Sequence, residues 1–373
     1  MATDTPLSYE LLASDGEARR GRVTTSRGTF ETPVFMPVGT RGAVVHLDQR
    51  DYHDLEMEVV LGNTYHLMLR PGAQTISELG GLHGFTGWDG HMLTDSGGFQ
   101  VMSLTDNVRI DPDGVTFTSI YDGDKVRFTP EDAVHTQEML GADIQMVLDI
   151  CPALPSSDRE VRQAMETTHE WAARAKAAHQ LEGQALFGIV QGGIDEAMRH
   201  ESGAVLAGLD FPGYGIGGLS VGEAHSERMP ALRAALSELP TSKPRYLMGV
   251  GDPVSIVDGI GAGVDMFDCV LPTRLARHGT ILTSHGRLNL RNAKHARDDS
   301  PLDETNPFSR QFSRAYLRHL LQVKEPTAAR VATLHNLWFL HDLVRQARAA
   351  IEDGRYETFR QGIVDVWTSP VQR

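Results

Sequence analysis

A recurring unit constrains the fold of this 373-residue chain more than any other feature. A short apolar segment is followed by a polar or glycine-rich stretch and then by a pattern with helical spacing. The near-continuous apolar character of these segments is what strands buried on both faces require. The eight predicted strands are Val34–Val38, Val59–Gly62, Met92–Asp95, Ile144–Asp149, Leu186–Gln191, Gly213–Gly217, Tyr246–Gly249 and Met266–Val270.

Helix signals lie between these strands. Thr129 and Asp252 are each followed by a proline, which is the pattern of an N-cap and a first helical residue. Longer helical patterns cover Ser157–Leu181, Asp195–Leu206 and Ser226–Leu239. Alternating strands and helices indicate a parallel sheet with right-handed crossovers. We therefore predict an α/β chain forming a single (β/α)8 TIM barrel over residues 1–373, with an open, doubly wound sheet as the alternative.

Two segments interrupt the alternation. Turn signals rich in Asp and Gly, with alternating residues between them, predict an antiparallel excursion over Asn107–Phe128, after the third strand. After the eighth strand, Thr280–Thr283, a turn at Ser284–Arg287 and Leu288–Arg291 predict a hairpin.

Composition narrows the class of protein. No apolar stretch approaches the roughly 20 residues that a membrane span needs. Residues Met1 to Ala13 lack the basic start and apolar block of a secretion signal. The only two cysteines, Cys151 and Cys269, exclude a disulfide framework and fit a reducing compartment. We expect a cytoplasmic protein with no membrane partner.

Charge is distributed unevenly along the chain. The net charge of −14 argues against a nucleic-acid partner. However, Val270–Arg297 contains no Asp or Glu. Its basic residues are Arg274, Arg277, Arg287, Arg291, Lys294 and Arg297, with His278, His285 and His295. This pattern predicts one polyanion-binding surface on an acidic body, with a solvated loop that has no partner as the alternative.

Polar side chains occupy the predicted strand ends, where TIM barrels place their reactive groups. Asp95, Asp149 and Gln191 end the third, fourth and fifth strands, and Asp268 lies in the eighth. Two aspartates at one site suit cleavage of a glycosidic bond, because one attacks the sugar carbon while the other moves the proton. The alternative for Asp95 is an N-cap, with the nearby Phe99 in the core, and the alternative for Asp268 is a buried structural ion pair.

Five motifs in order resemble the tRNA-guanine transglycosylase family, also called queuine tRNA-ribosyltransferase, and the resemblance covers nearly the whole chain. They are Thr94–Leu104 (TDSGGFQVMSL), Gly188–Gly193 (GIVQGG), Gly217–Glu223 (GGLSVGE), Arg245–Gly251 (RYLMGVG) and Met266–Arg274 (MFDCVLPTR). The resemblance implies a (β/α)8 barrel and a glycosyltransferase of queuosine biosynthesis. Such an enzyme exchanges guanine at the wobble position of GUN anticodons for a 7-deazaguanine base, through a covalent Asp–ribose intermediate.

The resemblance also implies roles for individual residues. Asp268 is the expected nucleophile and Asp95 the expected general acid and base. The expected substrate-binding residues are Asp95, Ser96, Gly97, Gly98, Phe99, Asp149, Gln191, Gly218, Leu219, Val221 and Met248. The expected RNA-binding residues are Gly249, Val250, Gly251, Asp252, Pro253, Val254 and Ser255, followed by Thr273, Arg274, Leu275, Ala276 and Arg277. Among these, Phe99 and Met248 sandwich the base, and Arg274 and Arg277 read neighbouring anticodon-loop bases. Valine at 221 favours the smaller 7-aminomethyl-7-deazaguanine over queuine.

The chain departs from the family pattern at the structural zinc site, which is normally Cys-x-Cys-x-x-Cys and a later histidine. The matching stretch, Glu304–Ser309, has no cysteine, and only His335 remains. We therefore predict no zinc and no cofactor. Residues 279–340 then form an RNA-contacting hairpin and a zinc-free subdomain held by apolar packing. The predicted packing residues are Phe308, Phe312, Tyr316 and Leu337.

The lost ligands keep other functions open. One alternative is a catalytically weak tRNA-binding paralogue or accessory subunit, and another is the same chemistry on DNA or an unusual RNA. The expected partners are the tRNA anticodon loop and a 7-deazaguanine base, and a homodimer is left open.

Overall fold

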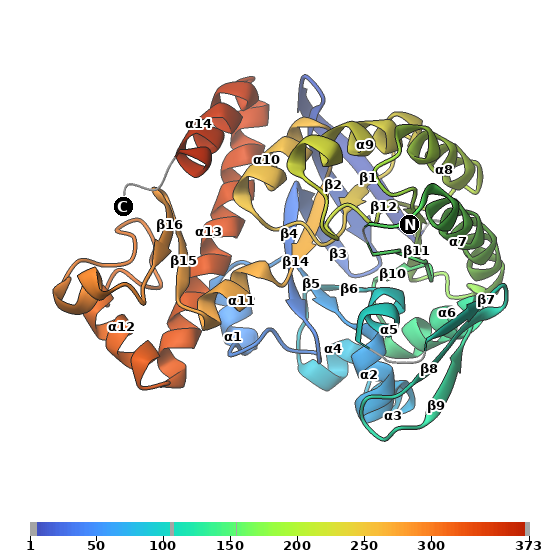
Figure 1. The fold of residues 1–373 in the computed structure, drawn as a ribbon, viewed down its shortest axis with the longest axis horizontal. Helices are drawn as coiled ribbons and strands as arrows, with labels where there is room; N and C mark the ends of the chain where they lie inside the picture. The colour runs from blue at the N-terminus through green and yellow to red at the C-terminus, as the bar shows by residue number, and fades with distance from the viewer. Residues whose placement is uncertain (1–5, 105–107, 154, 370–373) are drawn as a thin grey trace.

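The computed structural model describes residues 6–104, 108–153 and 155–369, and eight parallel strands close into a barrel at its centre (Figure 1). The strands are, in barrel order, β10 (Ile144–Met146), β11 (Ala185–Val190), β12 (Tyr214–Ile216), β13 (Arg245–Leu247), β14 (Met266–Cys269), β4 (Val34–Gly39), β5 (Val59–Gly62) and β6 (His91–Thr94). The barrel closes because β6 pairs with β10 through Leu93 and Ile144. The predicted (β/α)8 barrel is confirmed, and the open sheet is wrong.

All eight predicted strands exist, but most end earlier than the apolar pattern suggested. β10 ends at Met146 rather than Asp149, and β13 ends at Leu247 rather than Gly249. Val147 and Leu148, which follow β10, are fully buried without belonging to a strand. Buried residues thus continue beyond the last residues that pair with a neighbouring strand, so hydrophobicity alone overestimates strand length. The predicted site residues Asp149 and Met248 therefore lie in loops just beyond the strands.

Helices surround the barrel and connect its strands. They are α1 (Gln49–Asp54), α2 (Thr64–Leu67), the π-helix η1 (Met68–Gly72), α3 (Ala73–Glu78), α4 (Gly81–Thr86), α5 (Gly98–Leu104), α6 (Pro130–Leu140), α7 (Asp158–Ala178), α8 (Glu196–Gly208), α9 (His225–Glu238) and α10 (Pro253–Gly261). The predicted caps are confirmed, because the side chain of Thr129 accepts from Asp132 N and that of Asp252 from Ser255 N. No helix in the described ranges combines the length and hydropathy needed to cross a bilayer.

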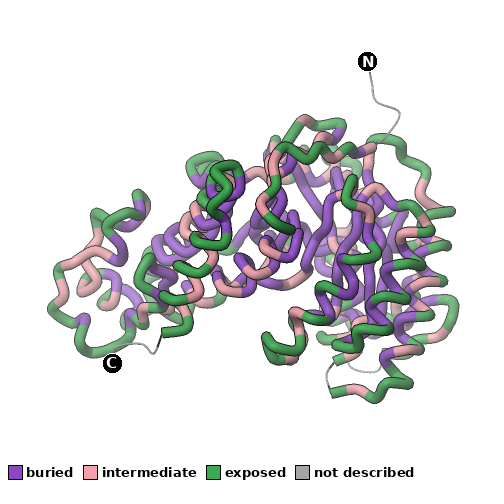
Figure 2. The backbone as a smooth tube through the Cα atoms, turned by 90° about the horizontal axis from the view of Figure 1, so that it is seen from above, coloured by how far each residue is buried: buried purple, intermediate pink, exposed green. Residues whose placement is uncertain are grey.

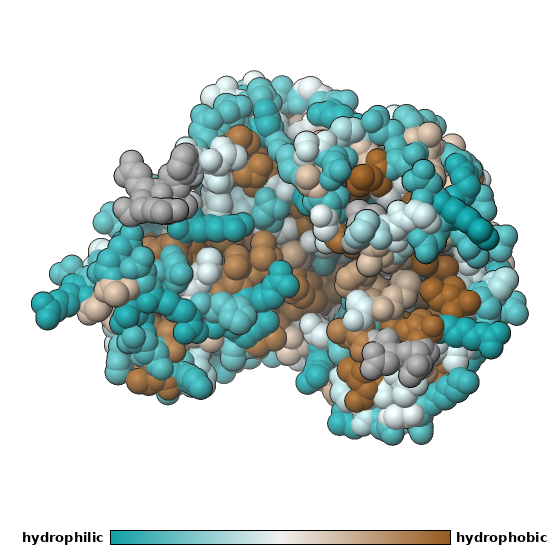
Figure 3. All heavy atoms as spheres, viewed as in Figure 1, coloured by the Kyte–Doolittle hydropathy of each residue, from teal (hydrophilic) through white to brown (hydrophobic). Residues whose placement is uncertain are grey.

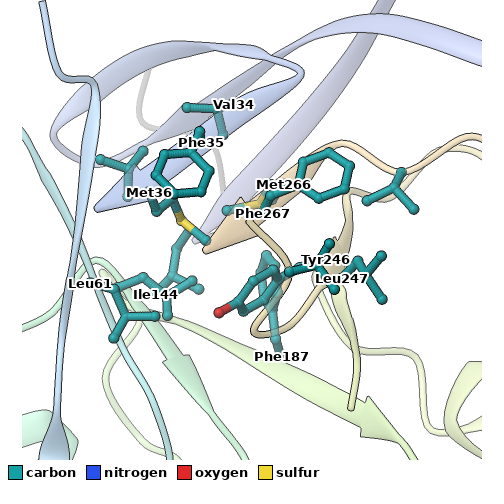
Figure 4. Packing of buried hydrophobic residues seen from close by; sticks show 14 of the residues in the cluster. Val34, Phe35, Met36, Leu61, Ile144, Phe187, Tyr246, Leu247, Met266 and Phe267 are labelled. Atoms are coloured by element: carbon teal, nitrogen blue, oxygen red, sulfur yellow. The ribbon is translucent and has the colours of Figure 1, made fainter. Parts of the chain in front are cut away.

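The barrel interior is filled by apolar side chains from many strands, including Met36, Leu61, Ile144 and Phe187 (Figure 4). At the N-terminal ends of the strands lies a three-stranded antiparallel sheet of β1 (Leu7–Asp15), β2 (Ala18–Thr25) and β3 (Gly28–Thr32). Two of its arginines reach buried aspartates that directly precede barrel strands. Arg19 pairs with Asp265 at 2.8 Å, and Arg27 pairs with Asp143 at 2.9 Å. This end of the barrel is thereby sealed.

The excursion after the third barrel strand is confirmed as a three-stranded antiparallel sheet. Its strands are β7 (Arg109–Asp111), β8 (Gly114–Thr118) and β9 (Lys125–Phe128). The first predicted residue, Asn107, lies outside the described residues. Phe117 and Phe128 pack with Trp171 of α7, so the sheet has its own apolar cluster beside the barrel.

The chain after β14 consists of α11 (Leu271–Arg277), β15 (Thr280–Thr283), β16 (Gly286–Asn289), the 3-10 helix η2 (Ala293–Arg297), α12 (Arg314–Gln322), α13 (Pro326–Glu352) and α14 (Tyr356–Thr368). Residues of α11, β15, α12 and α13 form a further buried cluster beside the barrel (Figure 2). The predicted hairpin is confirmed, but its turn is shorter than expected. Thr283 pairs with Gly286, so only Ser284 and His285 make the turn.

Candidate active site at the barrel mouth

Asp268 lies in β14, with its carboxyl group at the end of the barrel where the strands finish. Its Oδ1 accepts hydrogen bonds from the Tyr246 hydroxyl at 2.6 Å and from Gly249 N at 2.7 Å. The pKa of Asp268 is raised because the group is buried, although both bonds favour the charged form. Both donors bind the same oxygen, so within the described ranges Oδ2 accepts no bond and can face a substrate.

Asp95 directly follows β6 and is held by the loop after β5. Asn63 Nδ2 donates to its Oδ2 at 2.7 Å, and Thr64 N donates to its Oδ1 at 2.9 Å. Burial, together with the negative charges of Asp268 and Asp149, raises the pKa of Asp95 to about 7. This mutual influence places the three carboxyl groups in one site. A carboxyl with a pKa near neutrality can donate and accept a proton.

Asp149 and Gln191 meet in the floor of the site. The Asp149 carboxylate accepts from Ser96 Oγ at 3.1 Å and from Gln191 Nε2 at 2.7 Å. The Gln191 amide oxygen is buried and has no hydrogen-bond partner in the described part of the chain. It faces Gly218, where an added Cβ would come within 2.6 Å of it. A buried acceptor without a donor is costly, so this oxygen is well placed to receive an N–H group of a ligand.

The three mouth aspartates have no cationic partner. Within the described residues, neither Asp95, Asp149 nor Asp268 belongs to an ion pair, and all their bonds come from neutral donors. The alternative of a structural ion pair at Asp268 is therefore wrong. Uncompensated buried carboxylates are typical of sites where ionisable groups take part in chemistry.

A pocket of about 750 Å³ opens beside these groups, lined by Phe99, Met102, Ile150, Cys151 and Val221 among others. Figure 3 shows apolar side chains gathered around this hollow face, between the β7–β9 sheet and α11. Phe99 is 49% exposed, so the alternative that placed it in the core is wrong. An exposed ring at a pocket wall can stack on a flat base.

The loop after β12 is fixed by a buried carboxylate. Glu223 accepts from Val221 N at 3.0 Å and pairs with Arg228 at 2.7 Å, and its side chain has no exposed surface. Leu219 of the same loop is fully buried. The Val221 side chain is therefore held as part of the pocket wall.

The two predicted RNA-binding segments reach the surface only in part. In the first, Val250, Gly251, Pro253 and Ser255 are buried, whereas Gly249, Asp252 and Val254 are partly exposed. In the second, Thr273 and Ala276 are buried, Leu275 is half-buried, and Arg274 and Arg277 are exposed. The two arginines are therefore the side chains of α11 that can meet a ligand.

A groove of about 1630 Å³ joins these segments to the hairpin. Asp252, Val254, Leu275, His285, Arg287 and Lys294 are among its lining residues. Arg287, Arg291, Lys294 and Arg297 are exposed, and none of them forms an ion pair within the described residues. These four cations thus form an exposed face without carboxylate partners among the described residues, as a polyanion-binding surface requires, whereas the buried His295 pairs with Asp298 at 2.8 Å.

Comparisons with known proteins agree with this geometry. A family model described as queuine tRNA-ribosyltransferase matches residues 14–369. The chain belongs to the queuine tRNA-ribosyltransferase family. A queuine tRNA-ribosyltransferase of Herpetosiphon aurantiacus is 52% identical over 98% of this chain and 93% of its own length. Those of Rhizobium meliloti and Desulforudis audaxviator are 49% and 50% identical over 96% and 97% of this chain and 96% and 99% of their own lengths. The predicted family, and with it the enzyme class, is confirmed.

The residues present do not fit the zinc that the family pattern implies. His335 is fully buried; its Nε2 lies 2.8 Å from Leu282 O and its Nδ1 lies 2.7 Å from Ser309 Oγ. Nε2 must donate to the carbonyl, so Nδ1 accepts the serine proton, and neither nitrogen has a lone pair for a metal. Asn306 Nδ2 donates to His335 O at 3.1 Å. No cluster of three His, Cys, Asp or Glu suited to a metal occurs in the described part of the chain.

The packing predicted to replace the zinc is correct in part. Leu337 is fully buried in the core, and Phe308 and Phe312 pack against apolar clusters. The prediction for Tyr316 is wrong, because this residue is 47% exposed and only stacks on Phe312.

The sequence analysis missed several residues that hold the site together. Asn63 follows β5 as Asp95 follows β6, so the strand-end rule that found Asp95 should have found Asn63 as well. Tyr246 could have been singled out as a hydroxyl within a buried strand. Arg199, which is fully buried and donates to Val190 O and Gly193 O around Gln191, had no signal in an ordinary helical pattern.

Proposed function

We propose that this enzyme replaces guanine at the wobble position of tRNAs with GUN anticodons by a 7-deazaguanine base, as a step of queuosine synthesis. The observation that carries the proposal is the meeting of the buried Asp149 with the half-buried Asp95 and Asp268 at the mouth of the barrel, where the described residues place no cation in an ion pair with them. Membership of the queuine tRNA-ribosyltransferase family supports tRNA as the substrate.

The proposed chemistry divides between Asp268 and Asp95. Asp268 Oδ2 attacks C1′ of the ribose, the glycosidic bond to guanine breaks, and a covalent aspartyl–ribose ester forms. The departing guanine takes a proton from Asp95. The incoming base returns a proton to Asp95 as its nitrogen attacks C1′ and the ester bond breaks. The pKa of Asp95, raised to about 7, supports both roles.

The base pocket suits a purine-like ring. Asp149 and the unpartnered Gln191 amide oxygen are acceptors for the N–H groups of the base, and Gly218 lets the ring approach. Phe99 and Met248 are proposed to cover its two faces. Because Val221 narrows the pocket wall, we propose 7-aminomethyl-7-deazaguanine rather than queuine as the incoming base.

The RNA is proposed to lie across α11 and across the groove beside the hairpin, which belongs to the region of residues 279–340. Exposed Arg274 and Arg277 would read bases beside the target, and the remaining cations would contact phosphates. We also propose that the protein forms a homodimer, and the mass of the particle in analytical ultracentrifugation tests this.

The decisive experiment is a base-exchange assay with labelled guanine, unmodified tRNA and protein treated with a metal chelator. Label incorporated at the wobble position supports the proposal, and an RNA–protein adduct that is stable to denaturant supports the ester. Competition by 7-aminomethyl-7-deazaguanine against queuine identifies the base.

The alternative, a tRNA-binding paralogue, is motivated by the lost zinc ligands. Tight tRNA binding with no exchange would favour that alternative and refute the proposed reaction.

A further inference from the structure

A second cationic cluster lies at the mouth, outside the basic segment. The guanidinium carbons of Arg41 and Arg70 lie over the ring of Tyr121, at 5.9 and 4.8 Å from its centroid. The Tyr121 hydroxyl is 2.9 Å from His66 Nδ1. Arg41 follows β4, His66 and Arg70 follow β5, and Tyr121 belongs to the β8–β9 connection. Three separate loops therefore meet in this cluster.

Among the residues that the structure describes, the two arginines have no ion-pair partner that would explain their position. Both are exposed, whereas Tyr121 is half-buried and His66 is buried. Among residues 6–104, 108–153 and 155–369, neither guanidinium forms an ion pair or a hydrogen bond. Arg70 lowers the pKa of Asp122, but that carboxyl is stabilised mainly by its hydrogen bond with Ser119. Two like charges held over one ring would be relieved by an anion that accepts from both.

The cluster is tied to the proposed general acid by a short path. His66 N donates to Asn63 Oδ1 at 3.1 Å, and Asn63 Nδ2 donates to Asp95 at 2.7 Å. Asn63 is thus both the N-cap of α2 and a partner of Asp95. An anion held by this cluster would therefore lie near Asp95 and the nucleotide on which it acts.

The cluster also extends the basic face around the rim. In the barrel, β4 lies between β14, which leads into α11, and β5. Arg277 of α11 is close enough to His46, in the loop after β4, to help burial lower the pKa of that histidine. Cations therefore follow β14, β4 and β5 in order, and a chain of phosphates could pass along this rim.

We propose that Arg41 and Arg70, aligned by the ring of Tyr121, bind a phosphodiester group of the bound RNA next to the target nucleotide. This inference rests on the proposed function, because it assumes an RNA substrate at the mouth. It assigns a phosphate contact to the rim over β4 and β5, apart from the contacts of α11 and the hairpin.

The test is the affinity for unmodified tRNA, measured by fluorescence anisotropy across a salt series. We expect the double variant Arg41→Gln with Arg70→Gln to bind tRNA about tenfold more weakly. Each of the two substitutions should lower the slope of log Kd against log salt by about one. Arg→Lys at both positions should keep the slope. Tyr121→Leu should weaken binding more than Tyr121→Phe, which keeps the ring. The matched control is Arg233→Gln, which removes one exposed arginine that pairs with Glu17 near the opposite end.

The outcomes separate this inference from the proposed function. Unchanged affinity and slope in the folded double variant would overturn the inference, whether or not the wild type exchanges guanine. Arginine-dependent tRNA binding without exchange by the wild type would support the inference and refute the proposed reaction. If the double variant fails to fold by circular dichroism, the single Gln and Lys variants decide by the same slope. A wild type that does not bind tRNA would overturn both.

Discussion

The two ends of the barrel hold buried aspartates in opposite ways. At the N-terminal end, Asp143 and Asp265 are each bonded to an arginine, at 2.9 and 2.8 Å. At the mouth, the carboxyl groups of Asp95 and Asp268 accept, from the described residues, bonds of an amide, a hydroxyl and backbone N–H groups only. Asp143 and Asp265 are buried and Asp95 and Asp268 are half-buried, so the two ends differ in exposure to the mouth as well as in charge compensation. This difference teaches that a buried carboxylate without a cation is the one to examine for chemistry, since compensation fixes its charge and removes its reactivity.

The pKa directions follow this contrast for Asp143 and Asp95, whereas burial raises the pKa of Asp265 although Arg19 opposes the rise. His83, Arg27 and the bond from Met92 N hold the pKa of Asp143 below its usual value against the effect of burial. Burial raises the pKa of Asp95 to about 7, and neutral bonds are too weak to reverse it. Charged partners therefore oppose the effect of burial at the first end, whereas the mouth keeps Asp95, whose pKa lies near neutral pH.

The largest expected effect is the loss of exchange in Asp268→Asn. The amide cannot form the ester, so the rate should fall by about 10⁴-fold or more while the fold persists. Initial rates of guanine exchange and a circular dichroism spectrum check this. Exchange within tenfold of the wild-type rate would refute the assignment of the nucleophile.

The matching change at the other end should affect stability instead. Asp265→Asn leaves Arg19 buried and unpaired, so the free energy of unfolding should fall by about 3–5 kcal/mol. Denaturant titration measures the loss, and exchange per folded molecule should stay within a few-fold of wild type. The double variant Asp265→Leu with Arg19→Met should recover much of the stability. A large loss of exchange at full folding would break the contrast between the two ends.

A smaller effect is a pH-dependent gain of stability in Asp95→Asn. The folded-state pKa of about 7 lies above the unfolded value of 3.8, so wild-type stability falls as the pH rises from about 4 to 7. The amide lacks this penalty, and the unfolding temperature at pH 8 should exceed that of wild type by about 2–4 °C. The gain should vanish near pH 4. Thermal scans at several pH values check this, and a gain that persists at pH 4 would contradict the assigned cause.

The sequence predicted the scaffold better than the details of the site. Eight apolar segments and the proline-marked caps were enough to predict the barrel, because strands buried on both faces leave a strong pattern. The places of Asp95, Asp149 and Asp268 followed from the rule on strand ends. Asn63, Tyr246 and the Arg41–Tyr121–Arg70 cluster could not be predicted in this way. Their roles arise from contacts between loops that are distant in sequence, which no local pattern encodes.

The smallest expected effect concerns the network around His335, which resembles the mouth in using neutral bonds inside the protein. Ser309 Oγ and Leu282 O satisfy both ring nitrogens where the family pattern has a metal. Ser309→Ala should lower the free energy of unfolding by about 1–3 kcal/mol, because one buried nitrogen loses its partner. A metal chelator should shift the unfolding temperature of neither wild type nor variant. Replacing Tyr316, which is exposed, is the control with little expected change. A loss of stability on chelation would show that the neutral network is not what holds this region together.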